Sequence, residues 1–174
     1  TADVPGLQNI NQFGFFIGNC CQSNKFDEPI CFGEALLRAD NKGAVGYIGG
    51  SNNTYWDEDY WWAVGNTSNF TANPTYSATG LAAYDCLMHE NGEQQSDWFI
   101  TQGQVIHSGN LAVTEAGGSE DYYWEIYHLM GDPSLMPYIG VPTSLYVSHP
   151  SAVPLSTSTL TVNTEENAYV ALSI

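Results

Sequence analysis

The chain has 174 residues and is 43% hydrophobic, enough for one well-packed globular core. Its longest apolar runs fall well short of a membrane-spanning helix, so we expect no transmembrane segment. Nineteen acidic residues face only Lys25, Arg38 and Lys42, and the formal net charge is −16. Such a surface repels phosphate backbones, which argues against nucleic-acid binding and favours divalent cations and cationic partners.

The four cysteines, at positions 20, 21, 31 and 86, do not make a disulfide framework in a chain of this size. A bridge between the adjacent residues Cys20 and Cys21 would be strained. The Cys and His spacings typical of structural zinc sites are absent from the sequence. The cysteines therefore do not indicate the cellular compartment of the protein.

An aromatic and β-branched run at residues 13–18 predicts a short buried strand of the parallel-sheet kind. The loop after it, residues 19–26, carries Cys20 and Cys21. Ligands and catalytic groups of open α/β sheets collect just beyond the carboxyl ends of such strands, where a thiol is well placed to act as a nucleophile. The alternative is that both cysteines are small buried hydrophobic residues.

A helix is expected over residues 31–39, where apolar residues recur at helical spacing, and a second short strand over residues 44–48. Strand, helix and strand in this order predict a βαβ unit with a parallel pair. A second loop, residues 49–59, leaves the second strand at its carboxyl end. It should therefore lie beside the cysteine loop.

The rest of the chain divides into a helical part and a β-rich tail. Further helices are expected near residues 59–65, 77–90, 96–107 and 120–130. From Pro137 onward Ser, Thr, Val and Pro dominate, and alternation predicts strands at residues 144–148, 159–163 and 168–172. This is the strand spacing of a β-sandwich, which needs roughly a hundred residues to close. We therefore expect the tail to be only the beginning of a second domain.

A series of short motifs runs in order through residues 14–138. They are Ile17-Gly-Asn-Cys-Cys21, Cys31-Phe-Gly-Glu34, Tyr47-Ile-Gly49, Tyr55-Trp-Asp-Glu-Asp-Tyr60 with Trp62 and Val64-Gly65, Tyr84-Asp85, Gly109-Asn-Leu-Ala112, Tyr122-Tyr-Trp-Glu125 with Tyr127-His128, Gly131-Asp132, and Met136-Pro-Tyr138. The ordered set resembles the gingipain-type cysteine peptidases, and within them the lysine-specific branch. The resemblance implies a caspase-like α/β/α sandwich. Residues 1–138 would form the C-terminal part of the peptidase domain, and residues 139–174 the beginning of an immunoglobulin-like β domain.

The resemblance also implies a role for the cysteine pair. Cys21 matches the family's nucleophile and Cys20 its inert neighbour. Strand geometry agrees, because consecutive side chains leave a strand on opposite faces and only one can enter a cleft. The Cys21 backbone N–H would form part of the oxyanion hole.

Trp56 and Asp59 match residues of the family's primary specificity pocket, which the Asn19 carbonyl and Tyr55 would also line. A Trp face along an alkyl stem and a carboxylate at its far end suit a long cationic side chain. For Asp59 the alternative is a charge favoured by the dipole at a helix N-terminus. For the tryptophans it is core packing, which we expect for at least one of Trp56, Trp61 and Trp62.

The family's catalytic histidine lies upstream of the cysteine strand, in a stretch that precedes Thr1 in this numbering. The chain's own histidines, His89, His107, His128 and His149, are interpreted as core, surface, loop or tail residues. The implied partner of Cys21 is thus the upstream part of the same precursor, and this chain alone should not be an active peptidase.

The Phe26 carbonyl and Glu34 lie where the family binds a structural calcium ion, with the remaining ligands upstream. A hard cation with oxygen ligands suits the acidic composition. A solvated first-turn helix charge is the alternative for Glu34. No cofactor is expected for catalysis, and the resemblance implies a secreted or cell-surface protein of bacterial type.

Together these features predict a cysteine endopeptidase that cleaves after basic residues, with Lys preferred, through a Cys–His pair. Its substrates would be proteins and peptides. Two alternatives stay open. One is a catalytically inactive adhesion or glycan-binding module, because eleven Tyr and five Trp with many Asn and Asp suit a sugar-binding surface. The other is a caspase-like peptidase limited to processing its own precursor.

Overall fold

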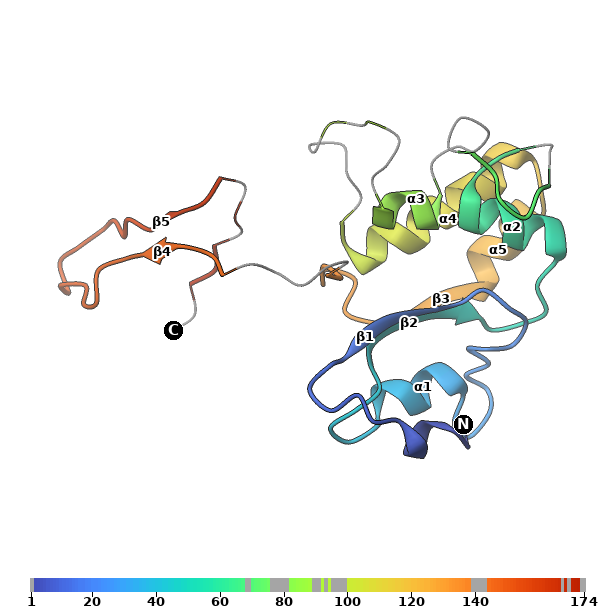
Figure 1. The fold of residues 1–174 in the computed structure, drawn as a ribbon, viewed down its shortest axis with the longest axis horizontal. Helices are drawn as coiled ribbons and strands as arrows, with labels where there is room; N and C mark the ends of the chain where they lie inside the picture. Colours follow the sequence, from blue (N-terminus) through green and yellow to red (C-terminus); the bar gives the residue numbers. More distant parts are fainter. Residues whose placement is uncertain are drawn as a thin grey trace. The chain divides into compact units, whose positions relative to one another are not determined.

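The computed structural model describes residues 2–67, 70–75, 82–88, 92, 94, 100–138, 144–166, 168 and 170–172. Its contacts divide the chain into two compact units, Thr1–Ile139 and Gly140–Ile174. The first unit contains a short 3₁₀ turn η1 (Val4–Gly6) and then β1 (Gly14–Gly18), α1 (Phe32–Leu37), β2 (Ala44–Gly50), α2 (Trp56–Val64), α3 (Ala83–Met88), α4 (Gln102–Ala116), α5 (Glu120–Ile126) and β3 (Tyr127–Gly131) (Figure 1). Within the described residues, no helix is long and apolar enough to cross a membrane.

The first unit is organised around a sheet of order β1-β2-β3. β1 and β2 are parallel, with Ile17 opposite Ile48, and they flank α1 in the chain. The predicted βαβ unit is therefore confirmed. β3 runs antiparallel to β2 and places Leu129 opposite Ile48.

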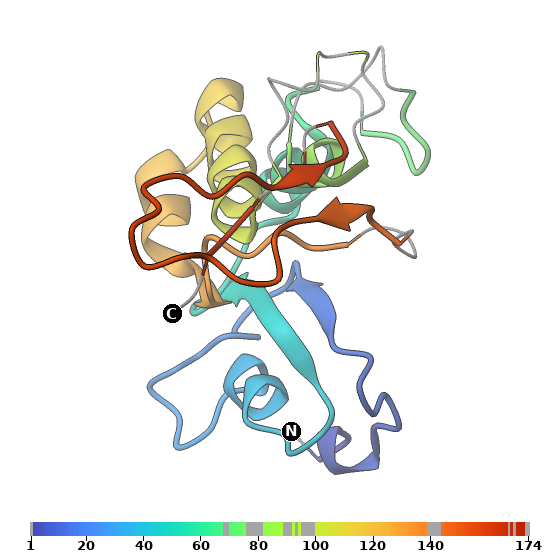
Figure 2. The same cartoon turned by 90° about the vertical axis from the view of Figure 1, so that its left-hand side faces the viewer.

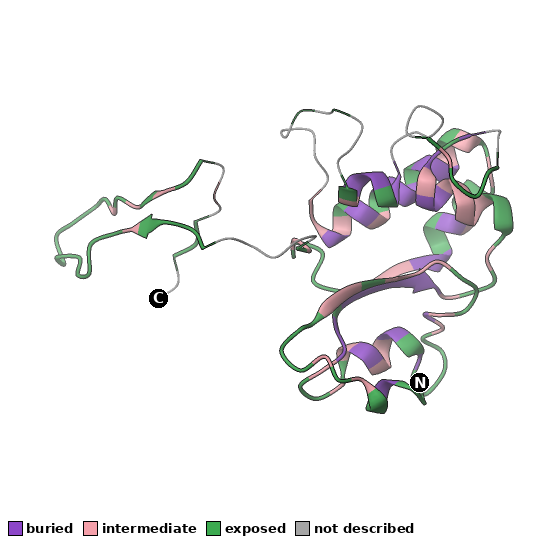
Figure 3. Cartoon of the chain, viewed as in Figure 1, coloured by how far each residue is buried: buried purple, intermediate pink, exposed green. Residues whose placement is uncertain are grey.

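Helices cover both faces of this sheet: α1 lies on one face, and α4 and α5 lie on the other with α2 and α3 packed beyond α4 (Figures 1 and 2). β2 forms the floor of both cores because its side chains alternate between the faces. Tyr47 joins a small cluster with Leu36 on the α1 side, and Ile48 joins the main cluster on the other side. That main cluster comprises Ile48, Trp62, Ala83, Val105, Val113, Tyr123, Ile126 and Tyr127. Figure 3 shows β2 and the inner side of α4 as mostly buried.

Local signals explain the ends of α4, the longest helix among the described residues. Its N-terminus has a capping box, in which the Thr101 hydroxyl accepts from the Gln104 N–H and the Gln104 side chain accepts from the Thr101 N–H. Its C-terminus ends at Gly117, whose φ of 69° lies in the left-handed region. Gly109 lets α4 approach α2 closely, because a Cβ at this position would collide with the Trp62 indole.

The predicted helix boundaries need three corrections. The helix expected at 59–65 begins earlier, at Trp56. The helix expected at 96–107 continues to Ala116, and its predicted start at 96–99 lies outside the described residues. The helix expected at 120–130 ends at Ile126, because residues 127–131 pair with β2 as β3. The described part of the 77–90 segment is helical over Ala83–Met88.

The second unit contains one antiparallel pair, β4 (Val147–Ser148) and β5 (Asn163–Thr164). Of the tail strands expected at 144–148 and 159–163, only the C-terminal end of each forms a strand. The described residues of 168–172 form none. Most side chains of this unit are exposed (Figure 3). Two short strands cannot bury a core of their own, so a β-sandwich is not shown.

Candidate active site

Two loops meet beyond the carboxyl ends of β1 and β2, as the βαβ geometry predicts. The Gln22 N–H donates to the Asn52 carbonyl at 2.9 Å, and the Asn24 N–H donates to the Gly50 carbonyl at 2.9 Å. The Asn24 side chain is fully buried and donates to the His128 carbonyl of β3 at 3.1 Å. The cysteine loop is thus hydrogen-bonded to the loop after β2, to the last residue of β2 and to β3.

The Cys21 thiol is exposed at the junction of these loops and hydrogen-bonds with Thr54. The Thr54 N–H donates to Cys21 Sγ at 3.2 Å, and Thr54 Oγ1 lies 3.5 Å from the same sulfur. Hydrogen bonds from the Thr54 hydroxyl and backbone lower the pKa of the Cys21 thiol, against smaller opposing effects of desolvation and of Asp59. A lowered pKa makes this exposed thiol easier to ionise.

The Asp59 carboxylate lies half-buried in the first turn of α2, where the helix dipole favours negative charge. Three hydroxyl groups surround it. Thr54 Oγ1 lies 2.6 Å from Asp59 Oδ2, and the hydroxyls of Tyr123 and Tyr127 lie 2.9 and 2.7 Å from Oδ1. Because a carboxylate offers about four acceptor positions, these donors leave room for one more. A ligand cation could take that position.

A buried aromatic stack holds the two tyrosines. The ring of Tyr127 stacks on Trp62 at 4.8 Å and on Tyr123 at 5.3 Å, measured between ring centroids. Burial raises the pKa of both tyrosines far above 10.0, and the Asp59 charge raises it further. Both hydroxyls therefore stay protonated as donors. Sequence reasoning did not assign them to the site, although both lie in the quoted motif around 122–128.

The structure brings Asn19 and Tyr55 to the same place. Asn19 Nδ2 donates to the Asp59 carbonyl at 2.8 Å, and its Oδ1 lies within hydrogen-bonding distance of the Tyr127 hydroxyl. Tyr55 precedes the first residue of α2, and its N–H donates to the Tyr123 hydroxyl at 2.8 Å. The side chain of Asn19, and not only the expected carbonyl, thus joins the cysteine loop to α2.

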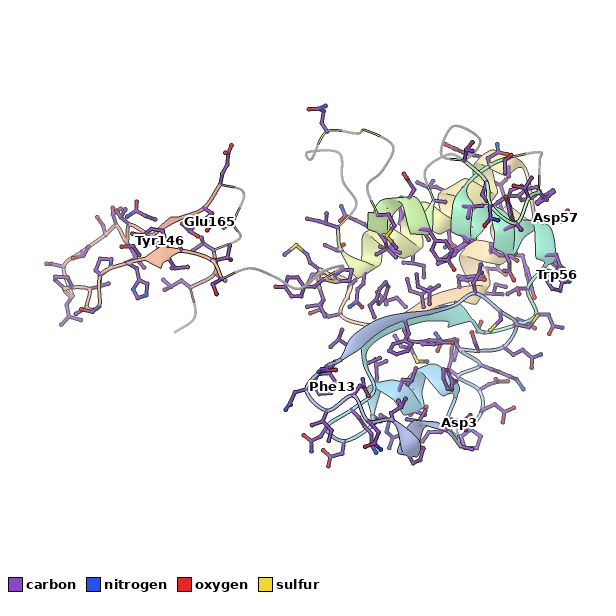
Figure 4. All side chains as sticks on the ribbon, in the orientation of Figure 1. Asp3, Phe13, Trp56, Asp57, Tyr146 and Glu165 are labelled. Atoms are coloured by element: carbon purple, nitrogen blue, oxygen red, sulfur yellow. The ribbon has the colours of Figure 1, made fainter. Side chains whose placement is uncertain are left out.

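Trp56 is 93% exposed, and its side chain points away from the body of the unit (Figure 4). Core packing is therefore the wrong interpretation for Trp56. The buried tryptophan is Trp62, which is fully inaccessible and donates to Asn110 Oδ1 at 3.0 Å.

The two residues proposed for calcium contact other residues of the chain. The Glu34 carboxylate lies in the first turn of α1 and pairs with Arg38 at 2.7 Å, while the Phe26 ring packs edge-on against His128. Calcium takes six to eight oxygen ligands. In the part of the chain that is described, no three His, Cys, Asp or Glu side chains cluster to hold a metal.

The three described histidines, His107, His128 and His149, contact residues other than Cys21. His107, expected in a loop, lies in α4 with its ring against Trp124. His128 lies in β3, where burial lowers its pKa. His149 lies in the second unit, with Nδ1 2.9 Å from the Pro150 carbonyl, and His89 is outside the described residues. None of the described three is among the hydrogen-bond partners recorded for Cys21.

Comparison with known proteins gives matches over most of the chain. Lys-gingipain of Porphyromonas gingivalis (strain ATCC 33277) is 38% identical over 178 residues, which cover 98% of this chain and 10% of that protein. Gingipain R2 of Porphyromonas gingivalis (strain W83) is 28% identical over 177 residues, which cover 98% of this chain and 21% of that protein. The chain thus spans about a tenth of the length of Lys-gingipain.

Solved structures agree with this relationship. A structure described as a protease is 35% identical with a TM-score of 0.80, covering 94% of this chain and 36% of the other. An Arg-specific cysteine proteinase, gingipain R, has the same fold at 24% identity, with a TM-score of 0.71 and coverage of 94% and 35%. Residues 1–138 match the model of Peptidase family C25. The chain therefore belongs to peptidase family C25, and its first unit is part of a caspase-like α/β fold.

Proposed function

We propose that this chain is the nucleophile-bearing part of a cysteine endopeptidase that cleaves proteins after basic residues, Lys preferred. The observation that carries the proposal is the connection through Thr54, which contacts both the exposed Cys21 sulfur and the Asp59 carboxylate. Cleavage next to a cationic side chain requires a nucleophile and an anionic recognition group that lie close together. Thr54 contacts both of these groups.

In the proposed reaction, the Cys21 thiolate attacks the carbonyl carbon of the substrate, and the Cys21 N–H donates to the developing oxyanion. A histidine outside this chain takes the thiol proton and gives it to the departing amine as the C–N bond breaks. Water then hydrolyses the thioester and releases the acid product. The substrate's ammonium group binds Asp59 while Trp56 covers its alkyl stem.

The preference for Lys over Arg is supported by the similarity to Lys-gingipain, which is higher than that to gingipain R2. The upstream histidine, the structural calcium ion with Phe26 and Glu34 as ligands, and secretion are further parts of the proposal. We also propose that the second unit begins an immunoglobulin-like domain.

The test uses the complete protein that contains this chain, with matched peptides that carry Lys, Arg or norleucine at P1. Cys21→Ala should lower kcat/KM by about 10³-fold or more, while Cys20→Ala should retain activity. Asp59→Asn should lower kcat/KM for the Lys peptide far more than for the norleucine peptide. Activity that survives Cys21→Ala, or faster cleavage after norleucine than after Lys, would refute the proposal.

A second experiment separates the peptidase from the two alternatives. A lysyl chloromethyl ketone should alkylate Cys21 in a peptidase and leave a glycan-binding module unmodified. Turnover of the Lys peptide in trans excludes a protein that only processes its own precursor. Absence of both labelling and turnover in the complete protein would favour the binding module.

A further inference from the structure

Thr54 contacts both the candidate nucleophile, Cys21, and the candidate specificity group, Asp59. Its hydroxyl oxygen lies 2.6 Å from Asp59 Oδ2 and 3.5 Å from Cys21 Sγ. Its backbone N–H separately donates to the sulfur at 3.2 Å. The main chain of Thr54 is thus committed to Cys21, while its side chain faces two acceptors.

A hydroxyl group carries a single hydrogen and can donate to one of these acceptors at a time. The distances place that hydrogen on Asp59 in the free enzyme, because the contact to the carboxylate is short and charge-assisted. In that state the hydroxyl presents a lone pair to the sulfur, and it can lower the pKa of the thiol only when its hydrogen turns to the sulfur.

We infer that a cationic P1 side chain bound at Asp59 releases the Thr54 hydroxyl to donate to the Cys21 thiolate, so that substrate recognition activates the nucleophile. This inference rests on the proposed function of the site. The ammonium group offers Asp59 up to three replacement donors, so the carboxylate loses nothing when the hydroxyl turns away. Thr54 is therefore a positioning residue that acts on the chemistry through Cys21.

Two other effects act on the thiol and must be separated from this one. The Asp59 charge raises the thiol's pKa, and a bound cation cancels that effect without help from Thr54. Burial and the nearby charges of Tyr55 and Cys21 raise the pKa of Tyr122 on α5, whose hydroxyl donates to the Asn53 carbonyl at 2.9 Å. A variant that removes only the Thr54 hydroxyl isolates its contribution, because both other groups remain.

The experiment measures the rate of Cys21 alkylation by iodoacetamide in the complete protein, in a Cys20→Ser background that leaves one exposed thiol in the described chain. n-Butylamine, which is the side chain of lysine, is compared with 1-butanol at constant pH and ionic strength. The amine should accelerate alkylation several-fold. Thr54→Val keeps the backbone donor and the shape of the side chain. It should retain only the smaller part of the acceleration, which comes from cancelling the Asp59 charge. Thr54→Ser should restore the full acceleration.

A variant of the acceptor gives an independent readout. Asp59→Ala frees the hydroxyl permanently, so alkylation should be fast without amine and should not respond to it. Adding Thr54→Val to Asp59→Ala should remove the part of that gain that the hydroxyl carries and leave the part due to the lost charge, which completes a double-mutant cycle. Equal acceleration by the amine in wild type and in Thr54→Val would overturn the inference. The proposed function would survive that result as long as Cys21→Ala and Asp59→Asn behave as stated above.

Discussion

The hydroxyl groups of Tyr123 and Tyr127 converge on one oxygen of Asp59, at 2.9 and 2.7 Å. The two rings stack with their planes 18° apart. The position of the carboxylate is thus set by the aromatic core of the unit, and not by the exposed first turn of α2 alone.

Removal of either hydroxyl should weaken recognition of Lys. In Tyr127→Phe we expect KM for the Lys peptide to rise several-fold, because Asp59 loses a donor that fixes its orientation. kcat should change less, and cleavage of the norleucine peptide should be nearly unaffected. Tyr60→Phe is the matched control, since the Tyr60 hydroxyl contacts the Thr71 carbonyl away from Asp59. An equal loss for both peptides would point to general damage instead.

The same tyrosines predict how stability depends on alkaline pH. Below pH 10.0 they are protonated in both the folded and the unfolded chain. Above that pH they ionise in the unfolded chain while burial keeps them neutral in the folded one, so the free energy of unfolding should fall as pH rises. Denaturant titrations at several pH values between 8 and 11 should show this decrease, and Tyr127→Phe should make it shallower. An unchanged slope in the variant would contradict the prediction.

Replacing Gln102 with an apolar residue should stabilise the folded protein. Its side chain is fully buried at the start of α4, and neither amide atom has a hydrogen-bond partner within the described residues. Gln102→Met keeps the shape without the unpaired polar atoms and should raise the free energy of unfolding by about 1 kcal/mol. Gln104→Ala, two residues along the same helix, should lower it by a similar amount because it removes the capping box. Thermal denaturation of the two variants tests both signs.

The proposed calcium site predicts a response to chelation. EGTA should lower the Tm of the complete protein, and Glu34→Gln should abolish that response because it removes a charged ligand. Glu28→Gln is the control. Glu28 forms a comparable exposed ion pair, with Lys25 at 2.7 Å, and such pairs contribute little to stability. If EGTA has the same effect on wild type and Glu34→Gln, the ligand assignment is wrong.

The parts of the fold that the sequence predicts well are those with local signals. β1, α1 and β2 follow from short apolar runs around one helical segment, and the parallel pairing places the two loops together. β3 could not be predicted in this way. Residues 127–130 follow α5 without a Gly or Pro that would end the helix, and only pairing with β2 makes them part of a strand.

Side-chain direction is the main limit on predicting the site. Cys21 and Asp59 could be proposed from their positions in motifs, but Trp56, Trp61 and Trp62 could not be sorted into core and surface. Tyr123 and Tyr127 were missed for the same reason. They lie 64 and 68 residues from Asp59 in the chain, and their approach depends on the packing of α5 and β3 against α2.

The contrast between Tyr127 and Trp56 has an evolutionary consequence. Tyr127 is locked by a strand on one side and by stacked rings on the other, whereas Trp56 has almost no neighbours to constrain it. Substitutions at Trp56 can therefore accumulate without disturbing the position of the Asp59 carboxylate. Relatives should diverge first in which long side chains they tolerate, and only later in whether they demand a positive charge.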